Sequence, residues 1–402
     1  MKNKNVSRRD FVKTLGVVGM ASAVGAGRSL AQPGPAPATS VPAPLKPQQI
    51  ATRPFGRTGV NVSMLGLGGI FDITSNQLVL KQALAWGVTY WDTAAGYNNG
   101  RSEEGIGLFL GKNPEARKEI FLVTKYDGGG LDDALNQSLE KLKTDYVDMY
   151  FMHGEMPGPE TKAWAEKMKA AQKIRFFGFS THSNMENDLQ AAARLGWIDG
   201  IMLKYDYRLA QNDAMKAAVD AATGAGIGLT AMKTQGGDSI RTETEADLKM
   251  GGHFLQRGFT QQQAKLKAVW ENSRIACICS QMANATVLHA NVAAALDKTS
   301  LTAEDHAVLR EYAQATASRH CAGCTRFCEN VPGHQAPIGD VMRALMYHRS
   351  YGDAERARAA FARIPEAARS ALAGFDYSAA ERVCPNRMPI ARLMREAGEL
   401  FS

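Results

Sequence analysis

From about residue 53 to residue 297, short apolar runs alternate with longer amphipathic stretches. Apolar runs of four to six residues suit buried strands, and the amphipathic stretches are typical of helices that cover a sheet. The pattern predicts strands over residues 63–67, 88–91, 120–124, 148–152, 174–179, 200–203, 227–231 and 275–279. It predicts helices over residues 76–86, 103–110, 131–141, 161–171, 185–194, 213–222, 261–272 and 286–296.

Strict alternation of strand and helix predicts an α/β chain with parallel strands and helical crossovers. Eight such units over about 245 residues fit a closed (β/α)₈ TIM barrel, which we expect over residues 51–297. An open doubly wound sheet is the alternative. It is disfavoured because the glycines at residues 66–69 lack the G-x-G-x-x-G spacing of a Rossmann site. Residues 298–402 are expected to form a small, mostly helical segment that contains cysteines.

The first 31 residues have the pattern of a targeting leader. A basic start precedes an uncharged stretch at residues 14–27, and small residues at 29 and 31 suit a cleavage site. Residues 7–13 (SRRDFVK) resemble the twin-arginine export signal, which implies export of the folded protein by the Tat machinery to the periplasm. The proline-rich residues 32–50 are expected to be an extended linker.

The charge is concentrated in that leader. It contains six of the 47 basic residues and one of the 40 acidic ones, so the net charge of +7 falls to +2 without it. We therefore predict no nucleic-acid partner. No later segment reaches 18 apolar residues, so we also predict no membrane span.

Four residues with carbonyl-reduction chemistry lie at or near predicted strand ends. Asp92, Lys125 and His153 each follow a predicted strand, and Tyr97 lies in the loop after Asp92. In a barrel of this kind, strand ends form the site. Tyr97 would donate a proton to the alkoxide that hydride transfer leaves, and Lys125 would lower the pKa of that phenol. Asp92 would hold Lys125, and His153 would orient the carbonyl oxygen.

The segments around these residues resemble the aldo-keto reductases. This resemblance implies a (β/α)₈ barrel and reduction of a small-molecule carbonyl substrate with NADPH, or NADH. It also implies that Asp92, Tyr97, Lys125 and His153 are the catalytic tetrad. The matching segments are residues 53–59 (RPFGRTG), 65–69 (LGLGG), 87–97 (GVTYWDTAAGY), 102–103 (SE), 122–125 (LVTK) and 145–153 (DYVDMYFMH).

The same resemblance implies where a nicotinamide cofactor is held. Three positions depart from the family pattern: Thr181 replaces an asparagine, Met202 a glutamine, and Ala283 a basic residue that binds the 2′-phosphate. Loss of that cation removes a strong phosphate contact, so NADPH is not clearly preferred over NADH. The positions that keep the pattern, and that we expect to bind the cofactor, are Ser180, Gln281, Met282 and Asn291.

Four cysteines beyond the predicted barrel have the spacing of a metal site, C-x₂-C-x₃-C followed much later by Cys-Pro. The spacing resembles an iron–sulfur ligand set, and some aldo-keto reductases carry a C-terminal ferredoxin-like segment of this kind. Structural zinc and two disulfides are the alternatives. Cys277 and Cys279 in the last predicted strand are expected to be buried and structural. The expected [4Fe–4S] ligands are Cys321, Cys324, Cys328 and Cys384.

Two functions follow. The first is an exported reductase with a cluster beside its barrel and an electron-transfer partner. The alternative is an iron–sulfur electron-transfer or sensory module on a catalytically weak barrel. Residues 154–158 and 235–258 are expected to be substrate-selecting loops, residues 349–363 a solvated helix face, and His182 and His253 solvated loop residues.

Overall fold

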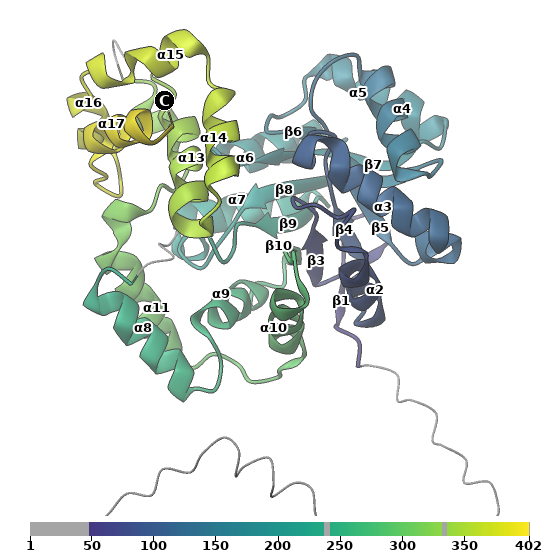
Figure 1. Cartoon of the computed structure of the whole chain (residues 1–402), viewed down its shortest axis with the longest axis horizontal. Helices are drawn as coiled ribbons and strands as arrows, with labels where there is room; N and C mark the ends of the chain where they lie inside the picture. The colour runs from purple at the N-terminus through teal and green to yellow at the C-terminus, as the bar shows by residue number, and fades with distance from the viewer. Residues whose placement is uncertain (1–47, 237–241, 332–335, 402) are drawn as a thin grey trace, which may run out of the picture. The chain divides into compact units, whose positions relative to one another are not determined.

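The computed structural model describes residues 48–236, 242–331 and 336–401, so the predicted leader and all but the last three residues of the predicted linker lie outside the described residues. Eight parallel strands close into one barrel in the order β10–β3–β4–β5–β6–β7–β8–β9 (Figure 1). This confirms the α/β class and the (β/α)₈ barrel. The strands are β3 (Leu65–Gly68), β4 (Tyr90–Asp92), β5 (Phe121–Tyr126), β6 (Val147–His153), β7 (Ile174–Thr181), β8 (Gly200–Lys204), β9 (Gly228–Met232) and β10 (Ile275–Gln281).

Each predicted helix is present around these strands. The expectation that residues 235–258 form only a loop was wrong, because helix α8 (Glu245–Gln256) lies within that range. Thr244 caps its first turn in a capping box with Asp247, a local signal that was available in the sequence. The other barrel helices are α2 (Gln77–Ala85), α3 (Arg101–Lys112), α4 (Leu131–Leu142), α5 (Pro159–Ala170), α6 (Met185–Leu195), α7 (Asp213–Gly224), α9 (Gln261–Trp270) and α10 (Ala285–Leu296).

A hairpin that was not predicted closes the amino-terminal end of the barrel. Strands β1 (Thr52–Pro54) and β2 (Asn61–Ser63) pair antiparallel. Between them Phe55 is fully buried among the interior side chains. Strands β8 and β9 begin at Gly200 and Gly228, where a Cβ atom would lie 2.8 and 2.6 Å from the Phe55 ring. Glycine at these two positions therefore makes room for the aromatic ring that fills the floor.

Side chains that alternate along the strands fill the barrel interior. The inward rows run Tyr90 to Asp92, Val123 to Lys125 and Phe151 to His153, so each row is apolar below and ends in a polar residue. The opposite rows pack against the surrounding helices in the largest apolar core. Consequently the polar row ends collect at the carboxyl-terminal mouth.

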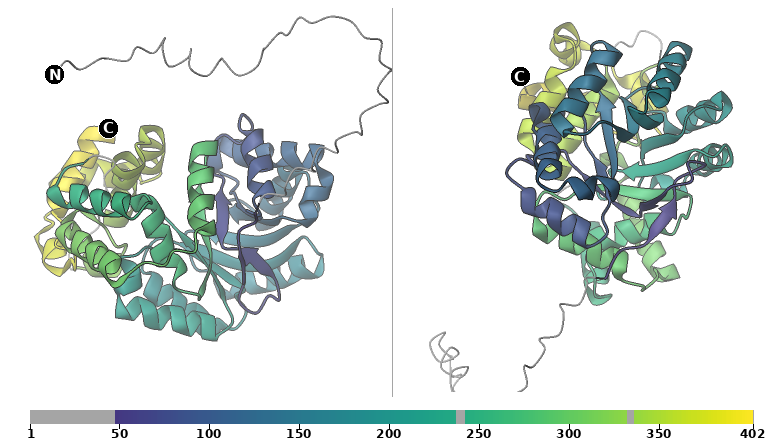
Figure 2. Two further views of the ribbon diagram at one scale, coloured as in Figure 1. Left: turned by 90° about the horizontal axis from the view of Figure 1, so that it is seen from below. Right: turned by 90° about the vertical axis from the view of Figure 1, so that its right-hand side faces the viewer.

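The chain after the barrel is mostly helical and contains no strand among its described residues, as predicted. Its later helices form one group beside the barrel (Figure 2), around an apolar core of their own. No helix of the described residues is long and apolar enough to cross a membrane. The helices are α11 (Ala303–Ala315), α12 (Thr325–Cys328), α13 (Ile338–Tyr351), α14 (Ala354–Ala362), α15 (Glu366–Ala371), α16 (Ser378–Val383) and α17 (Ile390–Phe401).

Candidate active site

Lys125 and Asp92 form a buried ion pair at the barrel mouth. The Lys125 Nζ atom lies 2.5 Å from Asp92 Oδ1 and donates a second hydrogen bond, of 2.8 Å, to the carbonyl oxygen of Thr93. Lys125 is only 1% exposed. Burial alone would lower the pKa of Lys125, but the Asp92 carboxylate and the Tyr97 oxygen offset this and raise it. Lys125 is therefore a charged ammonium group at neutral pH.

Tyr97 lies beside this ammonium group. The Lys125 Nζ atom is 4.7 Å from the centroid of the Tyr97 ring, and the rings of Tyr97 and His153 meet edge to face at 5.7 Å. Asn98 and Asn99 follow in left-handed conformations, which asparagine tolerates better than most residues and which turn the loop sharply after Tyr97.

The pKa of Tyr97 differs from the prediction. Burial raises the pKa of Tyr97 above its ordinary value, and the nearby charge of Lys125 opposes this only in part. The prediction of a net lowering was wrong because it left out the cost of burying a phenolate. The phenol is therefore protonated at neutral pH, which is the form that donates a proton.

Asp127 is a site residue that the sequence analysis missed. One of its carboxylate oxygens contacts Nδ1 of His153, and the other accepts a 2.5 Å hydrogen bond from the backbone amide of Gly96. Burial would raise the pKa of Asp127, but His153 and the amide outweigh it, and the pKa is lowered. The signal was present, since Asp127 continues the inward row of Val123 and Lys125. The aspartate thus links His153 to the loop that precedes Tyr97.

We expect Asp127→Asn to lower the free energy of unfolding by about 1.5–3 kcal/mol at neutral pH, as for one lost hydrogen bond to a charged group. Because folding lowers this carboxyl pKa, its contribution is complete above about 4, the pKa of an unfolded aspartate. The contribution of the Asp127 carboxylate to stability is lost as the pH falls below this value. The stability of the wild type should therefore fall toward that of the variant. Denaturant unfolding across pH measures this, with the exposed Asp133→Asn as control. A difference independent of pH would contradict it.

A second missed residue is Lys204, which ends the inward row of β8 after Met202. Lys204 is buried, 6% exposed, and its ammonium donates a hydrogen bond to the carbonyl oxygen of Cys321. Side chains alternate between the two faces of a strand, so Lys204 faces the same side as the buried Met202. This alternation could have identified Lys204 from the sequence. The chain after the barrel thus reaches directly into the mouth.

Of the residues expected to bind the cofactor, Ser180, Gln281 and Met282 lie at or just beyond the ends of β7 and β10, and Asn291 lies on α10. Ser180 pairs with His153 across the sheet and accepts a 3.2 Å hydrogen bond from the amide of Gly154. Asn291 belongs to a closed triangle of hydrogen bonds with Ser280 and Gln235. These polar side chains line the mouth, and each hydrogen-bonds to another group of the protein.

Gln281 and Met282 differ in whether their side chains could reach a cofactor. The side chain of Gln281 accepts a 2.9 Å hydrogen bond from Arg356 of α14, and the same guanidinium contacts the carbonyl oxygen of Ile70 at 2.5 Å. Met282 is fully buried in the apolar core, so its side chain cannot reach a cofactor, contrary to the prediction. The register of the strand explains this, because Met282 follows the inward Gln281 and points outward.

Helices α13 and α14 cover part of the mouth. Lys233 Nζ lies 3.2 Å from the hydroxyl of Tyr347, and a Cβ atom on Gly236 would lie 2.5 Å from the hydroxyl of Tyr351. The predicted solvated face at residues 349–363 was therefore wrong in part: Arg349 pairs with Glu396, and Arg356 reaches the barrel. Contacts between distant segments decide these environments.

Two histidines were also expected in solvent. His253 instead shares a 2.6 Å hydrogen bond with the buried Asp305, which joins α8 to α11. His182 is half-buried and lines a cavity.

The four C-terminal cysteines line one cavity together, with Ile338, Met342 and Met388 among its apolar walls. None of the six cysteines forms a disulfide, and Cys277 is buried inside the barrel as predicted, with Cys279 partly buried. Among the described residues, no three His, Cys, Asp or Glu side chains are arranged to hold a metal ion. The thiols therefore surround a shared space without the arrangement that a single metal ion needs.

The fold has close counterparts among solved structures. An aldo/keto reductase from Klebsiella pneumoniae, solved with NADP and acetate, has a TM-score of 0.54 and 25% identity, covering 65% of this chain and 95% of that one. An aldo-keto reductase from Bacillus halodurans in its holo form has a TM-score of 0.55 and 23% identity, covering 66% and 96%. At 23% identity, this second likeness concerns the fold alone.

Curated relatives match parts of the sequence. An NADP(+) aldo-keto reductase of Schizosaccharomyces pombe is 31% identical over 180 residues, 39% of this chain and 52% of that protein. A methylglyoxal reductase of Escherichia coli strain K12 is 36% identical over 107 residues, 25% of this chain and 38% of that protein. The chain thus spans about half the length, or less, of these relatives. A sequence model of the aldo/keto reductase family matches residues 65–317, which is more than half of the chain, and the protein therefore belongs to that family.

Proposed function

We propose that the protein reduces the carbonyl group of a small molecule, or oxidises the corresponding alcohol, with a nicotinamide dinucleotide as hydride carrier. The observation that carries this proposal is the convergence of Asp92, Tyr97, Lys125 and His153 at one barrel mouth. Family membership and the NADP-bound relative from Klebsiella pneumoniae support it. The alternative of an electron-transfer module on a catalytically weak scaffold has no comparable support, because all four catalytic side chains are present together.

The mechanism follows from the charges at the mouth. Tyr97 is protonated at neutral pH and donates its proton to the oxygen of the carbonyl as that oxygen gains negative charge. The ammonium of Lys125 then stabilises the phenolate, and Asp92 keeps the ammonium in place. Because Asp127 occupies Nδ1 of His153, the Nε2 atom is left to hydrogen-bond the carbonyl oxygen and orient it. A bound nicotinamide supplies the hydride to the carbonyl carbon.

The residues at the ends of β7 and β10 fit such a cofactor in chemical type. Ser180 would hold the nicotinamide end, and the polar groups of Ser280 and Asn291 would hold the adenosine end. Ala283 provides no cation for the adenosine end. The guanidinium of Arg356 on α14 instead donates a hydrogen bond to the side chain of Gln281, two residues before Ala283. We infer that Arg356 supplies the phosphate contact that Ala283 cannot make.

Titration of the purified full chain with NADPH and NADH tests this proposal, together with activity on a panel of aldehydes and ketones. We expect NADPH to bind, and Arg356→Ala to weaken it about 10-fold or more, because a charge-assisted hydrogen bond contributes about 1.5–3 kcal/mol. Arg358→Ala is the control, because Arg358 is exposed on the same helix. If neither nucleotide binds and no carbonyl compound is reduced, the reductase proposal fails.

We further propose that Cys321, Cys324, Cys328 and Cys384 hold a [4Fe–4S] cluster. One zinc ion would need its sulfur ligands at about 2.3 Å from a single centre. Among the described residues no three such side chains are arranged to hold a metal ion, so the proposal rests on the spacing of the cysteines and on the cavity that they share. In a four-iron cluster each thiolate binds a different iron, so four thiols around one shared cavity suit it better. Such a cluster would exchange single electrons with a partner protein.

Anaerobic purification of the full chain tests the cluster. We expect about four iron and four sulfide ions per chain, and a visible absorbance that dithionite bleaches. Cys384→Ser should lose most of this absorbance, whereas Cys279→Ser in the barrel should keep it. Stoichiometric zinc without sulfide, or cysteines paired as disulfides, would refute the cluster.

We propose export through the Tat machinery to the periplasm, on the sequence of the leader alone. Since this route carries folded proteins, the protein would leave the cytoplasm with its cofactors already bound. Cell fractionation tests this proposal: replacing both Arg8 and Arg9 with lysine should keep the full chain in the cytoplasm. Unchanged export of that variant would contradict the proposal.

A further inference from the structure

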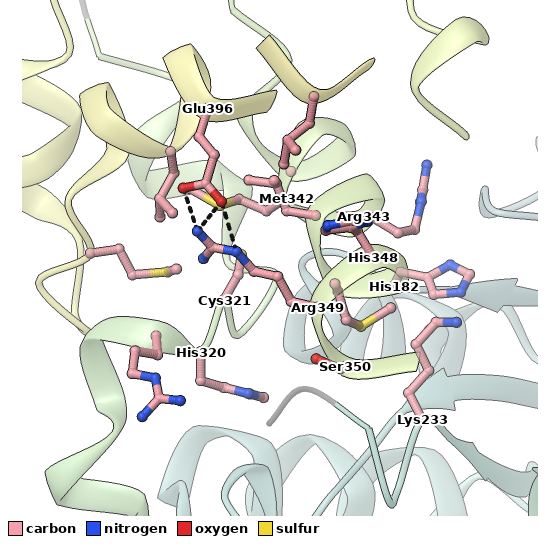
Figure 3. A pocket seen from close by; sticks show the side chains of 18 of the residues that line it. His182, Lys233, His320, Cys321, Met342, Arg343, His348, Arg349, Ser350 and Glu396 are labelled. Atoms are coloured by element: carbon pink, nitrogen blue, oxygen red, sulfur yellow. Dashed lines mark hydrogen bonds and ion pairs between the residues drawn. The ribbon is translucent and has the colours of Figure 1, made fainter. Parts of the chain in front are cut away.

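A large cavity lies between the barrel mouth and the C-terminal helices (Figure 3). Its volume is about 820 Å³. His182, Lys204 and Lys233 line it from the ends of β7, β8 and β9, while α13 and α17 line the opposite side. Cys321 belongs to this cavity and to the cavity of the four cysteines.

Cations exceed anions along this cavity. Six lysine and arginine residues line it, against three glutamates. Two of the glutamates are already engaged, since Glu396 pairs with Arg349 and Glu243 pairs with Arg319. In Figure 3 the Arg349–Glu396 pair lies toward one end of the cavity, and Lys233 and His182 lie toward the other. Arg319, Arg343 and Arg349 form ion pairs, which leaves Lys204 and Lys233 at the barrel end and Arg392 on α17 without one among the described residues.

Lys204 and Lys233 are the two cations at that end. Lys204 donates to the carbonyl oxygen of Cys321, and Lys233 to the hydroxyl of Tyr347, so both have neutral partners. Within residues 48–236, 242–331 and 336–401, neither forms an ion pair with a carboxylate. Buried charges in proteins are normally paired, because an unpaired one loses its hydration without compensation. Lys204 is buried and Lys233 is half-buried, and burial lowers the pKa of Lys233. An anionic ligand in this cavity would compensate both ammonium groups and favour the charged form of Lys233.

Two further observations concern the end of the cavity that the barrel strands form. The Nδ1 atom of His182 is buried and has no hydrogen-bond partner within the described part of the chain. Lys233 has a backbone φ of +60°, in the left-handed region, which is costly for a lysine and is typical of functional sites. An anion at this point would accept hydrogen bonds from both lysines.

The four residues proposed as catalytic do not line this cavity, but Lys204, which does, lies two strands away from His153. Lys204 is the inward residue at the end of β8, and His153 ends β6, with β7 alone between these strands. At about 4.8 Å between neighbouring strands, the two strands are about 10 Å apart. One small molecule can therefore place its carbonyl at Tyr97 and His153 and a charged group at Lys204.

We propose that the substrate is a carbonyl compound with a carboxylate or phosphate group several bonds from the carbonyl, and that Lys204 and Lys233 bind that anionic group. This proposal rests on the proposed function. It is independent of the cofactor contacts at the ends of β7 and β10.

The test compares adipic semialdehyde with hexanal, which have equal chain length and differ in the terminal carboxylate. We expect kcat/KM to be at least about 10-fold higher for the charged aldehyde, since one hydrogen bond to a charged group contributes about 1.5–3 kcal/mol. Lys204→Met should bring the ratio of the two values close to one. Lys216→Met on the exposed face of α7 should leave the ratio unchanged. Equal kcat/KM values for the two aldehydes in the wild type would overturn the proposal.

A binding measurement separates this proposal from the reductase proposal. Adipate and inorganic phosphate should each raise the melting temperature of the wild-type full chain, and less so that of Lys204→Met. If adipate stabilises the protein but no aldehyde is reduced, the anion site stands and the reductase proposal fails. If Lys204→Met weakens NADPH binding and leaves adipate binding unchanged, the cavity serves a cofactor phosphate and the substrate proposal is wrong.

Discussion

Replacing Tyr97 with phenylalanine is expected to lower kcat by at least about 100-fold, the low end for losing a general acid. The phenol lies beside Lys125 and His153, and phenylalanine keeps the ring while it removes the hydroxyl proton. NADPH binding and the melting temperature should change little, because the ring still fills the same space. Steady-state turnover with an aldehyde substrate measures kcat. NADPH titration and thermal unfolding measure cofactor binding and the melting temperature.

The matched control is Tyr126→Phe. Its hydroxyl donates to the carbonyl oxygen of Gly129 at the end of β5 and does not contact Lys125. This variant should keep nearly full activity. If Tyr97→Phe retained more than about a tenth of the wild-type turnover, another group would have to be the acid.

The second large effect is expected on stability. Lys125→Met should lower the free energy of unfolding by about 3–5 kcal/mol, because it leaves the carboxylate of Asp92 buried without its partner. Replacing both residues, Asp92→Leu with Lys125→Met, should recover much of this loss, since no buried charge then remains. Denaturant unfolding of the single and double variants measures the difference.

A surface pair provides the comparison. Lys118 and Glu115 form an ion pair in which both side chains are at least 80% exposed, so Lys118→Met should have almost no effect. Because folding raises the pKa of Lys125, its stabilising contribution is complete below about 10.4, the pKa of an unfolded lysine. That contribution falls as the pH rises through the folded-state pKa. A double variant as unstable as Lys125→Met would show that packing, and not the buried charge, is responsible.

The helical segment after the barrel changes what the mouth can bind. Tyr347 and Arg356 belong to this segment, and each contacts a strand-end region of the barrel. Cys321 connects the segment to Lys204 and lines both cavities. A cluster held by Cys321 would therefore lie next to the cavity in which we place the substrate.

Local patterns in the sequence determined the barrel and indicated the residues that we propose as catalytic. Alternation of strands and helices specified the eight units, and the period of two along each strand placed Asp92, Lys125 and His153 on inward rows. The same period also indicated Asp127 and Lys204, each two residues beyond an inward residue. These features are readable because strand geometry links neighbouring positions within a single element.

The tertiary structure alone decided which distant groups meet. The contact of Arg356 with Gln281 joins residues 75 positions apart, and that of Lys204 with Cys321 joins residues 117 positions apart. It also decided the pKa direction of Tyr97, because burial depends on everything packed around the phenol. No local period encodes such contacts, since they arise from the docking of one folded segment on another.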